Sequence, residues 1–220
     1  MKPSLVLAAL AAVVACGPAG ADQDISKVNG SIEVSPGEHA GNLDTVNGAI
    51  RVGANAVVGK ADTVNGSITL DSRATATSLG TVNGSVTMNA GARVTGPAGT
   101  VNGSMKVVDG ADLGGALTNV NGAIHVSAAH VAGQIETTNG DILIGPNAHI
   151  DGGIHMNADT TWWHFFMFAS TPRVVIGPGS VVRGPLHFER AVKLYVSDHA
   201  SIGPVTGATA IRFAGADPPG

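Results

Sequence analysis

The heptapeptide VNGAIRV at residues 46–52 is followed by VNGSITL at residues 64–70, and this pair of segments decides the fold. Val-Asn-Gly occurs six times at a nearly constant interval, and a variant starting with threonine continues the series. A short, steady period is typical of a solenoid, in which each repeat forms one coil and buries its apolar side chains only against its neighbours. The repeats begin at Val28, Val46, Val64, Val82, Val101, Val120 and Thr138.

Aliphatic residues also recur every six positions within a coil, as in Val46, Val52 and Val58, which predicts three sides per coil. Because strand side chains alternate, we expect Val, Gly, Ile and Val to point inward, and Asn, Ser or Ala and a variable residue to point outward. A second inward column is Ile32, Ile50, Ile68, Val86, Met105, Ile124 and Ile142. A small-residue column is Ala56, Ala74, Ala92, Ala111 and Ala148. The predicted fold is an all-β, three-sided, single-stranded β-solenoid (β-helix) of about 18 residues per coil.

Residues 1–21 are predicted to be a signal peptide. The apolar run at 5–15 is too short to span a bilayer as a helix. Two processing sites compete, because AGA at 19–21 suits ordinary signal peptidase, whereas VVAC at 13–16 resembles a bacterial lipobox. Cys16 is the one cysteine of the chain and has no partner for an internal disulfide, so it is the candidate lipidation site that would anchor the chain to a membrane.

The rest of the chain divides where the repeat stops and resumes. We expect β-solenoid repeats over 22–156, an aromatic-rich insert over 157–172, C-terminal solenoid coils over 173–212 and a tail over 213–220. The insert holds five of the eight aromatic residues, which suits either a flap against the solenoid wall or a docking patch for a partner. The candidate patch is Trp162, Trp163, Phe165, Phe166 and Phe168.

One asparagine of each repeat falls in the same position and forms a candidate row along the rod. Asn-Gly tolerates positive φ at a corner, and stacked amides can hydrogen-bond along a stack of strands. We therefore interpret the row as a structural ladder rather than as a ligand site. Its members are Asn29, Asn47, Asn65, Asn83, Asn102, Asn121 and Asn139.

The titratable residues predict no catalytic, cofactor or metal site. Carbohydrate-active solenoids need paired carboxylates on one face, and the outward position five residues into each coil carries none. That position holds Glu33, Arg51, Thr69, Thr87, Lys106, His125 and Leu143. His130 and His149 are separated by about one repeat length and could meet on neighbouring coils, with His155 nearby, but the sequence contains no compact His/Cys/carboxylate spacing.

The charge and composition of the chain argue against some classes of binding partner. The chain has a net charge of −4, 13% charged residues and no cluster of lysine and arginine, which argues against nucleic-acid binding. In a stack of coils, every strand except those at the two ends is paired on both sides. The end strands therefore invite self-association or contact with an envelope partner.

The three-sided coil with Val-Asn-Gly-Ser-Ile and Ala-x-Val-x-Gly elements resembles the bactofilin-type polymer-forming proteins, and also the adhesin-type β-solenoid repeats of bacteria. The likeness covers residues 26–156 and, more loosely, 173–206. A bactofilin resemblance implies a right-handed, nucleotide-free filament former of the cytoplasm, whereas the adhesin resemblance agrees with export. Neither resemblance implies catalytic residues.

These observations predict an exported, non-enzymatic protein of the periplasm, outer membrane or cell surface, with a structural, polymer-forming or adhesin-like role. A carbohydrate-binding or polysaccharide-modifying β-helix is the alternative. Hexapeptide-repeat acyltransferases share the period, and IGPNAH at 144–149 resembles their motif, but they use a cytosolic acyl donor that an exported chain would not meet.

Overall fold

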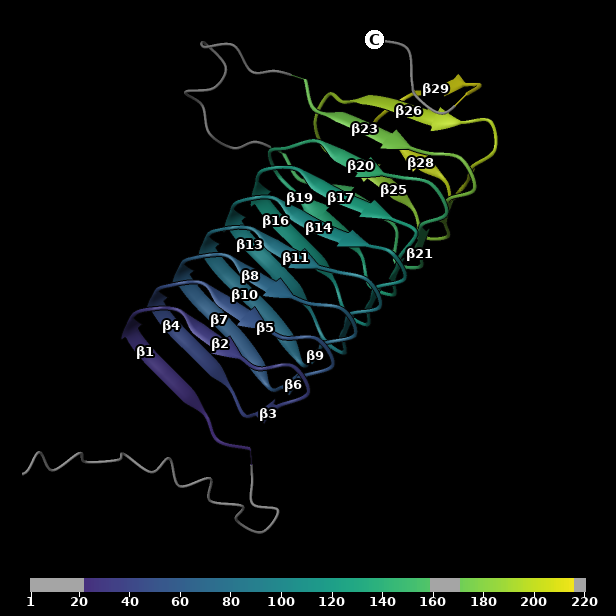
Figure 1. Cartoon of the computed structure of the whole chain (residues 1–220). Coiled ribbons are helices and arrows are strands. Elements are labelled where there is room, and N and C mark those ends of the chain that lie inside the picture. Colours follow the sequence, from purple (N-terminus) through teal and green to yellow (C-terminus); the bar gives the residue numbers. More distant parts are fainter. Residues whose placement is uncertain (1–21, 159–170, 216–220) are drawn as a thin grey trace, which may run out of the picture.

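The computed structural model describes residues 22–158 and 171–215, and every regular element in these ranges is a strand. The strands form three parallel sheets along a rod, with coils stacked from β1 at one end to β29 at the other (Figure 1). Each coil contributes one strand to each sheet in turn, except the last described coil, which has no strand in the third sheet. This arrangement confirms the predicted three-sided β-solenoid.

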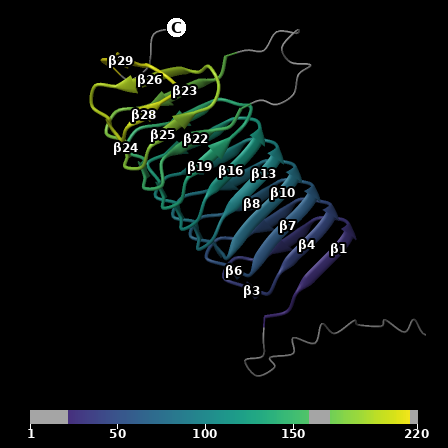
Figure 2. The ribbon, with the colours of Figure 1, turned by 180° about the vertical axis from the view of Figure 1, so that it is seen from behind.

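The three sheets contain ten, ten and nine strands. The first sheet is labelled in Figure 2, where the molecule is turned by 180° from the view of Figure 1. It consists of β1 (Ile25–Asn29), β4 (Leu43–Asn47), β7 (Lys60–Asn65), β10 (Ser78–Asn83), β13 (Ala98–Asn102), β16 (Leu117–Asn121), β19 (Ile135–Thr137), β22 (Ile154–Met156), β25 (Leu186–Phe188) and β28 (Val205–Thr206). The second consists of β2 (Ile32–Val34), β5 (Ile50–Val52), β8 (Ile68–Leu70), β11 (Val86–Met88), β14 (Met105–Val108), β17 (Ile124–Ser127), β20 (Ile142–Ile144), β23 (Arg173–Ile176), β26 (Lys193–Ser197) and β29 (Ala210–Phe213). The third consists of β3 (His39–Ala40), β6 (Val57–Val58), β9 (Thr75–Ala76), β12 (Arg93–Val94), β15 (Asp112–Leu113), β18 (His130–Val131), β21 (His149–Ile150), β24 (Val181–Val182) and β27 (Ser201–Ile202).

Neighbouring coils are paired in the register that the repeat predicts. In the second sheet, Ile50 pairs with Ile68, its equivalent in the next repeat. After Ile142 the next partner is Val174, so this coil is longer than the others and its extra residues lie between β22 and β23. The solenoid then continues for two further strands in the second sheet, β26 and β29.

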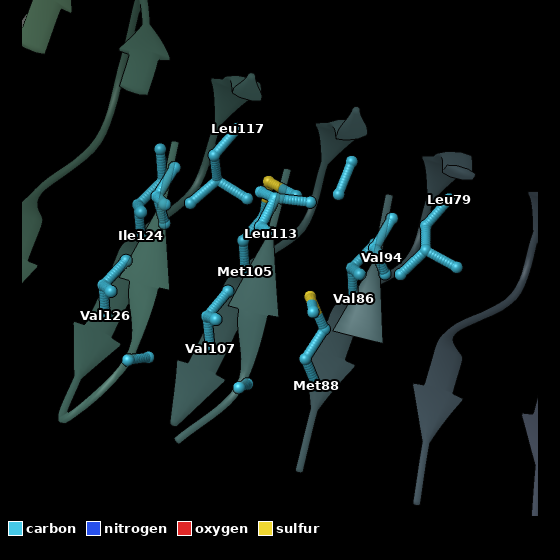
Figure 3. Packing of buried hydrophobic residues seen from close by; sticks show 14 of the residues in the cluster. Leu79, Val86, Met88, Val94, Met105, Val107, Leu113, Leu117, Ile124 and Val126 are labelled. Carbon is cyan, nitrogen blue, oxygen red and sulfur yellow. The ribbon is translucent and has the colours of Figure 1, made fainter. Parts of the chain in front are cut away.

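The core is a narrow column of aliphatic side chains from all three sheets. Leu79, Val86 and Val94 project into it from β10, β11 and β12 and are at most 3% exposed (Figure 3). The predicted isoleucine and alanine columns are buried as expected. Each fully buried Val or Leu side chain stabilises the fold by about 1.5–3 kcal/mol relative to an exposed one.

The prediction that the first valine of each repeat points inward is wrong. Val46 is 41% exposed, and its equivalents are between 38 and 68% exposed. The preceding residue, Thr45, is buried instead, and its Oγ1 donates a hydrogen bond to the carbonyl oxygen of Gly30 in the preceding coil, at 3.1 Å. Alternation therefore does not continue from Val46 to Ile50, because the corner at residues 47–49 resets which side faces inward.

Candidate functional site

The asparagine side chains of the repeats form a continuous row at the corner between the first and second sheets. In each coil Nδ2 donates to Oδ1 of the asparagine one coil earlier, over 2.9–3.3 Å. At the far end, Oδ1 of Asn139 accepts a hydrogen bond from Nη1 of Arg190. The amides thus bond mainly to one another, which is the arrangement expected of a structural ladder.

The glycine after every ladder asparagine except Asn29 is required by close backbone approach. A Cβ on Gly66 would lie 2.0 Å from the carbonyl oxygen of Gly48, and the other five stacked glycines of the row give values of 1.9–2.3 Å. Positive φ, the expected reason for Asn-Gly here, occurs only at the glycines of three repeats, Gly30, Gly122 and Gly140. The ladder asparagines themselves do not adopt it.

The outer face of the first sheet carries two hollows in line with the rod axis, each of about 440 Å³. One is lined by Val28, Val46 and Val64 together with Asp44 and Asp62. The other is lined by Val101 and Val120 of the same column and by Gly80 and Gly99, which stand where Asp44 and Asp62 do in the earlier coils. Exposed valines beside small or acidic residues thus form a shallow groove on this face.

Near the C-terminal end, the same outer face becomes polar and titratable. Glu136, His155, His187 and Thr206 follow one another in register on β19, β22, β25 and β28. Asn157 lies beside this column, and its Nδ2 donates to Oε1 of Glu136 at 2.7 Å. Ligand-forming side chains are therefore stacked at strand spacing, about 4.8 Å apart.

His155, His187 and Glu189 converge within this column, and their ligand atoms all lie within 4.8 Å of one another. His155 Nε2 is 3.2 Å from Glu189 Oε1, and His187 Nε2 is 3.8 Å from the same oxygen. The two imidazole rings meet edge to face with centroids 5.1 Å apart. The three side chains are 27–50% exposed, so the cluster is open to solvent.

Neighbouring groups hold this cluster in place. The backbone N–H of Ala158 donates to Glu189 Oε2 at 3.1 Å, and it is the main reason that the pKa of Glu189 is lowered, with His155 second. His187 Nδ1 lies 2.7 Å from Thr206 Oγ1. The carboxylate is therefore held ionised, and one nitrogen of His187 is already engaged away from Glu189.

A second set of charged groups lies on the outer face of the third sheet. His130 Nδ1 is 2.7 Å from Asp112 Oδ1, and its Nε2 is 3.0 Å from Asp151 Oδ2. These two hydrogen bonds, that of Asp151 first, raise the pKa of His130. Arg93 and Arg183 contact the outer oxygens of the two aspartates, so charges alternate along five positions.

His130 and His149, which the sequence allowed to meet on neighbouring coils, are aligned only through their backbones. The two residues pair in register on β18 and β21, but both ring nitrogens of His130 bind aspartates. His155, expected nearby, lies on the first sheet with His187. The three histidines therefore do not form one cluster, because His149 and His155 occupy different sides of a coil.

The second sheet presents the outward column that the repeat predicts, from Glu33 to Leu143. Beyond Leu143 the column turns apolar with Val175 and Tyr195, which are each 8% exposed and pack with Phe213 on the outer surface. Arg173 lies over the Tyr195 ring at 5.4 Å. This end of the rod therefore has a small apolar cluster outside the main core.

Several residues singled out from the sequence lie outside the described residues. They are the candidate lipidation site Cys16 and the candidate patch Trp162, Trp163, Phe165, Phe166 and Phe168.

The His155–His187–Glu189 cluster is what the sequence interpretation missed. Its two histidines are aligned across the interruption, so the interrupted coil separates them in the sequence instead of one regular repeat. The signal that could have found it is the spacing His-x-Glu at 187–189, which places two side chains on one face of a strand.

No protein-family model matches the chain, and neither the curated proteins nor the solved structures contain a significant match. Within residues 22–158 and 171–215, no helix is long and apolar enough to cross a membrane.

Proposed function

We propose that this chain is an exported structural rod of the bacterial cell envelope, without catalytic activity, that self-associates through its end strands. The observation that carries the proposal is the edge at each end of the stack. Among the described residues, β1, β2 and β3 at one end, and β28, β29 and β27 at the other, each pair with a single neighbour. The open edge of such a strand offers unpaired backbone donors and acceptors to another chain.

The regular side-chain columns support a structural role. Asparagine, glycine and buried threonine repeat at the same place in successive coils, and their polar groups are used mostly within the stack. The predicted signal peptide and the resemblance to adhesin-type repeats point to the envelope, and the resemblance to polymer-forming repeats points to self-association. In this proposal the rod supplies length and stiffness rather than chemistry.

Analytical sedimentation of the purified protein across concentration, with electron microscopy of the same samples, tests the proposal. We expect filaments or concentration-dependent growth. A strict monomer at every concentration would contradict self-association and would favour the role of an adhesin anchored as a single molecule.

A variant at the free edge sharpens this test. The N–H of Ile25 bonds to Asn42 in the neighbouring coil, so by alternation the N–H of Ser26 points to the open side of β1. Ser26→Pro removes that donor from an edge strand, where proline is tolerated. Growth should fall with Ser26→Pro and persist with the control Ser26→Ala.

Attachment to the envelope is tested separately. Cys16→Ser should release the protein from the membrane fraction if the lipobox is used, and leave its distribution unchanged if the site at 19–21 is used. If the aromatic insert docks on an envelope partner, replacing Trp162, Trp163 and Phe165 by serine should abolish association with that partner while leaving the β circular-dichroism signal intact. Unchanged association would mean that the insert has no part in attachment to the envelope.

Glycan binding is the second candidate, and the groove on the outer face of the first sheet favours it. Two hollows in line could accept an extended polymer. A glycan-binding screen of the wild type and of Val64→Asp tests this candidate. Binding that is lost in the variant would support it, and no binding by the wild type would exclude it.

A further inference from the structure

We propose that His155, His187 and Glu189 form a binding site for a divalent transition-metal ion, with Zn²⁺ as the ion best suited to these ligands. Two imidazoles and one carboxylate are a ligand set that open zinc sites use, in which water or another ligand completes the coordination. The site lies on the side of the rod, so it does not depend on self-association of the coil ends.

The strand architecture brings the three side chains together. His155 on β22 and His187 on β25 are register partners and therefore project from the same outer face. Glu189 follows His187 by two residues and returns to that face. Backbone pairing thus sets the spacing of the ligands, and little chain entropy remains to be lost when an ion binds.

The distances are close to those that an ion requires. Zn–N and Zn–O bonds of about 2.0–2.1 Å in a tetrahedral site place neighbouring ligand atoms about 3.3 Å apart. Glu189 Oε1 is 3.2 Å from His155 Nε2 and 3.8 Å from His187 Nε2. All three ligand atoms lie within 4.8 Å of one another, so ion binding requires small rotations of half-buried His155 and of the exposed His187 and Glu189 side chains.

The surrounding hydrogen bonds leave the ligand atoms available. Thr206 Oγ1 can accept the Nδ1 proton of His187, which leaves the lone pair on Nε2, the nitrogen that faces Glu189. The Ala158 N–H bonds to Oε2 of Glu189 and leaves Oε1 directed at both histidines. Metal-binding histidines and carboxylates are commonly oriented by such partners.

A plain ion pair between His155 and Glu189 is the simpler explanation of the contact. It accounts for the 3.2 Å distance, but it does not require a second imidazole nitrogen to face the same oxygen. By contrast, His130 shows how an ion pair is built in this rod, with one aspartate at each ring nitrogen. The convergence of three ligand atoms distinguishes the His155 cluster.

The experiment is a titration of tag-free, chelator-stripped protein with Zn²⁺, followed by calorimetry and by NMR of the histidine rings. We expect one equivalent to bind and the ring signals of His155 and His187 to shift. Loss of a residue that supports a metal ligand typically weakens metal binding by roughly 10- to 100-fold. His187→Ala and Glu189→Gln each remove a ligand itself and should weaken Zn²⁺ binding by at least as much. Thr206→Val should weaken it by about 10-fold through the orientation of His187.

The matched control is His125→Ala, which removes a half-buried histidine from the outer face of the second sheet. It should leave the affinity and the stoichiometry unchanged. Equal binding by wild type and the His187→Ala variant would overturn the proposal, as would a Zn²⁺ response confined to other histidines. Because sedimentation of the same samples reports self-association, failure of the metal site and failure of the proposed rod function are separate outcomes.

Discussion

Arg190 Nη1 donates hydrogen bonds to Oδ1 of Asn139 and, at 3.0 Å, to the carbonyl oxygen of Thr138. Asn139 is the last amide of the asparagine ladder, and its Oδ1 takes from Arg190 the bond that the next repeat would otherwise provide. The contact joins the coils after the interruption to the last regular repeat before it.

Arg190→Ala should therefore destabilise the fold. A hydrogen bond to a charged, partly buried group contributes about 1.5–3 kcal/mol, and we expect the free energy of unfolding in urea, followed by circular dichroism, to fall by that amount. Arg73→Ala is the control, because Arg73 bonds to Asn55 where both side chains are exposed, and it should have little effect. Equal effects of the two variants would mean that the ladder end needs no cap.

The stacked glycines predict a steric limit. Gly66→Ala places a methyl group 2.0 Å from the carbonyl oxygen of Gly48, and the coils must separate to accept it. We expect the free energy of unfolding to fall by about 3 kcal/mol, the upper end for overpacked sites. Ser67→Ala should be tolerated because alanine occupies the same position at Ala49 and Ala123. A stable Gly66→Ala protein would contradict the close approach.

The buried threonine row offers a matched pair. Thr63 Oγ1 donates to the carbonyl oxygen of Gly48 at 3.0 Å, whereas the buried Oγ1 of Thr137 has no hydrogen-bond partner within the described part of the chain. Thr63→Val should lower the free energy of unfolding by about 1 kcal/mol. Thr137→Val should be neutral or stabilising. Thermal and urea unfolding of both variants distinguishes the two cases, and equal losses would contradict the assignment.

Valines at two different positions of the repeat, taken from neighbouring coils, should respond differently to the same change. Val64 is 41% exposed and Val52 is fully buried. Val64→Thr should change the free energy of unfolding by less than about 0.5 kcal/mol, as is usual for surface positions. Val52→Thr buries a hydroxyl and should lower it by about 1–3 kcal/mol. A large loss at Val64 in urea unfolding would restore the inward orientation expected from the sequence.

The hydrogen bonds of His130 to Asp112 and Asp151 predict that the stability of the fold depends on pH. Because the pKa of His130 is raised in the folded protein, its contribution to stability is fully present below the ordinary histidine pKa of about 6.5. That contribution is lost as the pH rises through the folded pKa. NMR titration should place the folded pKa above that of a free histidine. His130→Gln should reduce the loss of unfolding free energy that occurs as the pH rises through the folded pKa of His130. An unchanged loss in the variant would mean that another group causes it.

The recurrence of Val-Asn-Gly predicts the coil length and the buried isoleucine column, and the six-residue spacing of aliphatic residues predicts the number of sides. They do so because strands in a stack must repeat their inward residues at the same interval. The orientation of Val46 was not predictable in this way. Alternation is a property of one strand, and the corner at Asn47 and Gly48 separates two strands whose alternation is set independently by backbone packing.

The repeat period of the sequence was enough to predict a β-solenoid with an asparagine at the same place in seven successive coils, because a local period carries that information. The contacts of His155 with His187 and of Arg190 with Asn139 could be found only from the folded chain. Both contacts cross the interrupted coil, where the number of residues between two stacked positions no longer follows the repeat. Which side chains lie side by side there depends on where the chain rejoins the stack, and backbone pairing with the preceding coil sets that point.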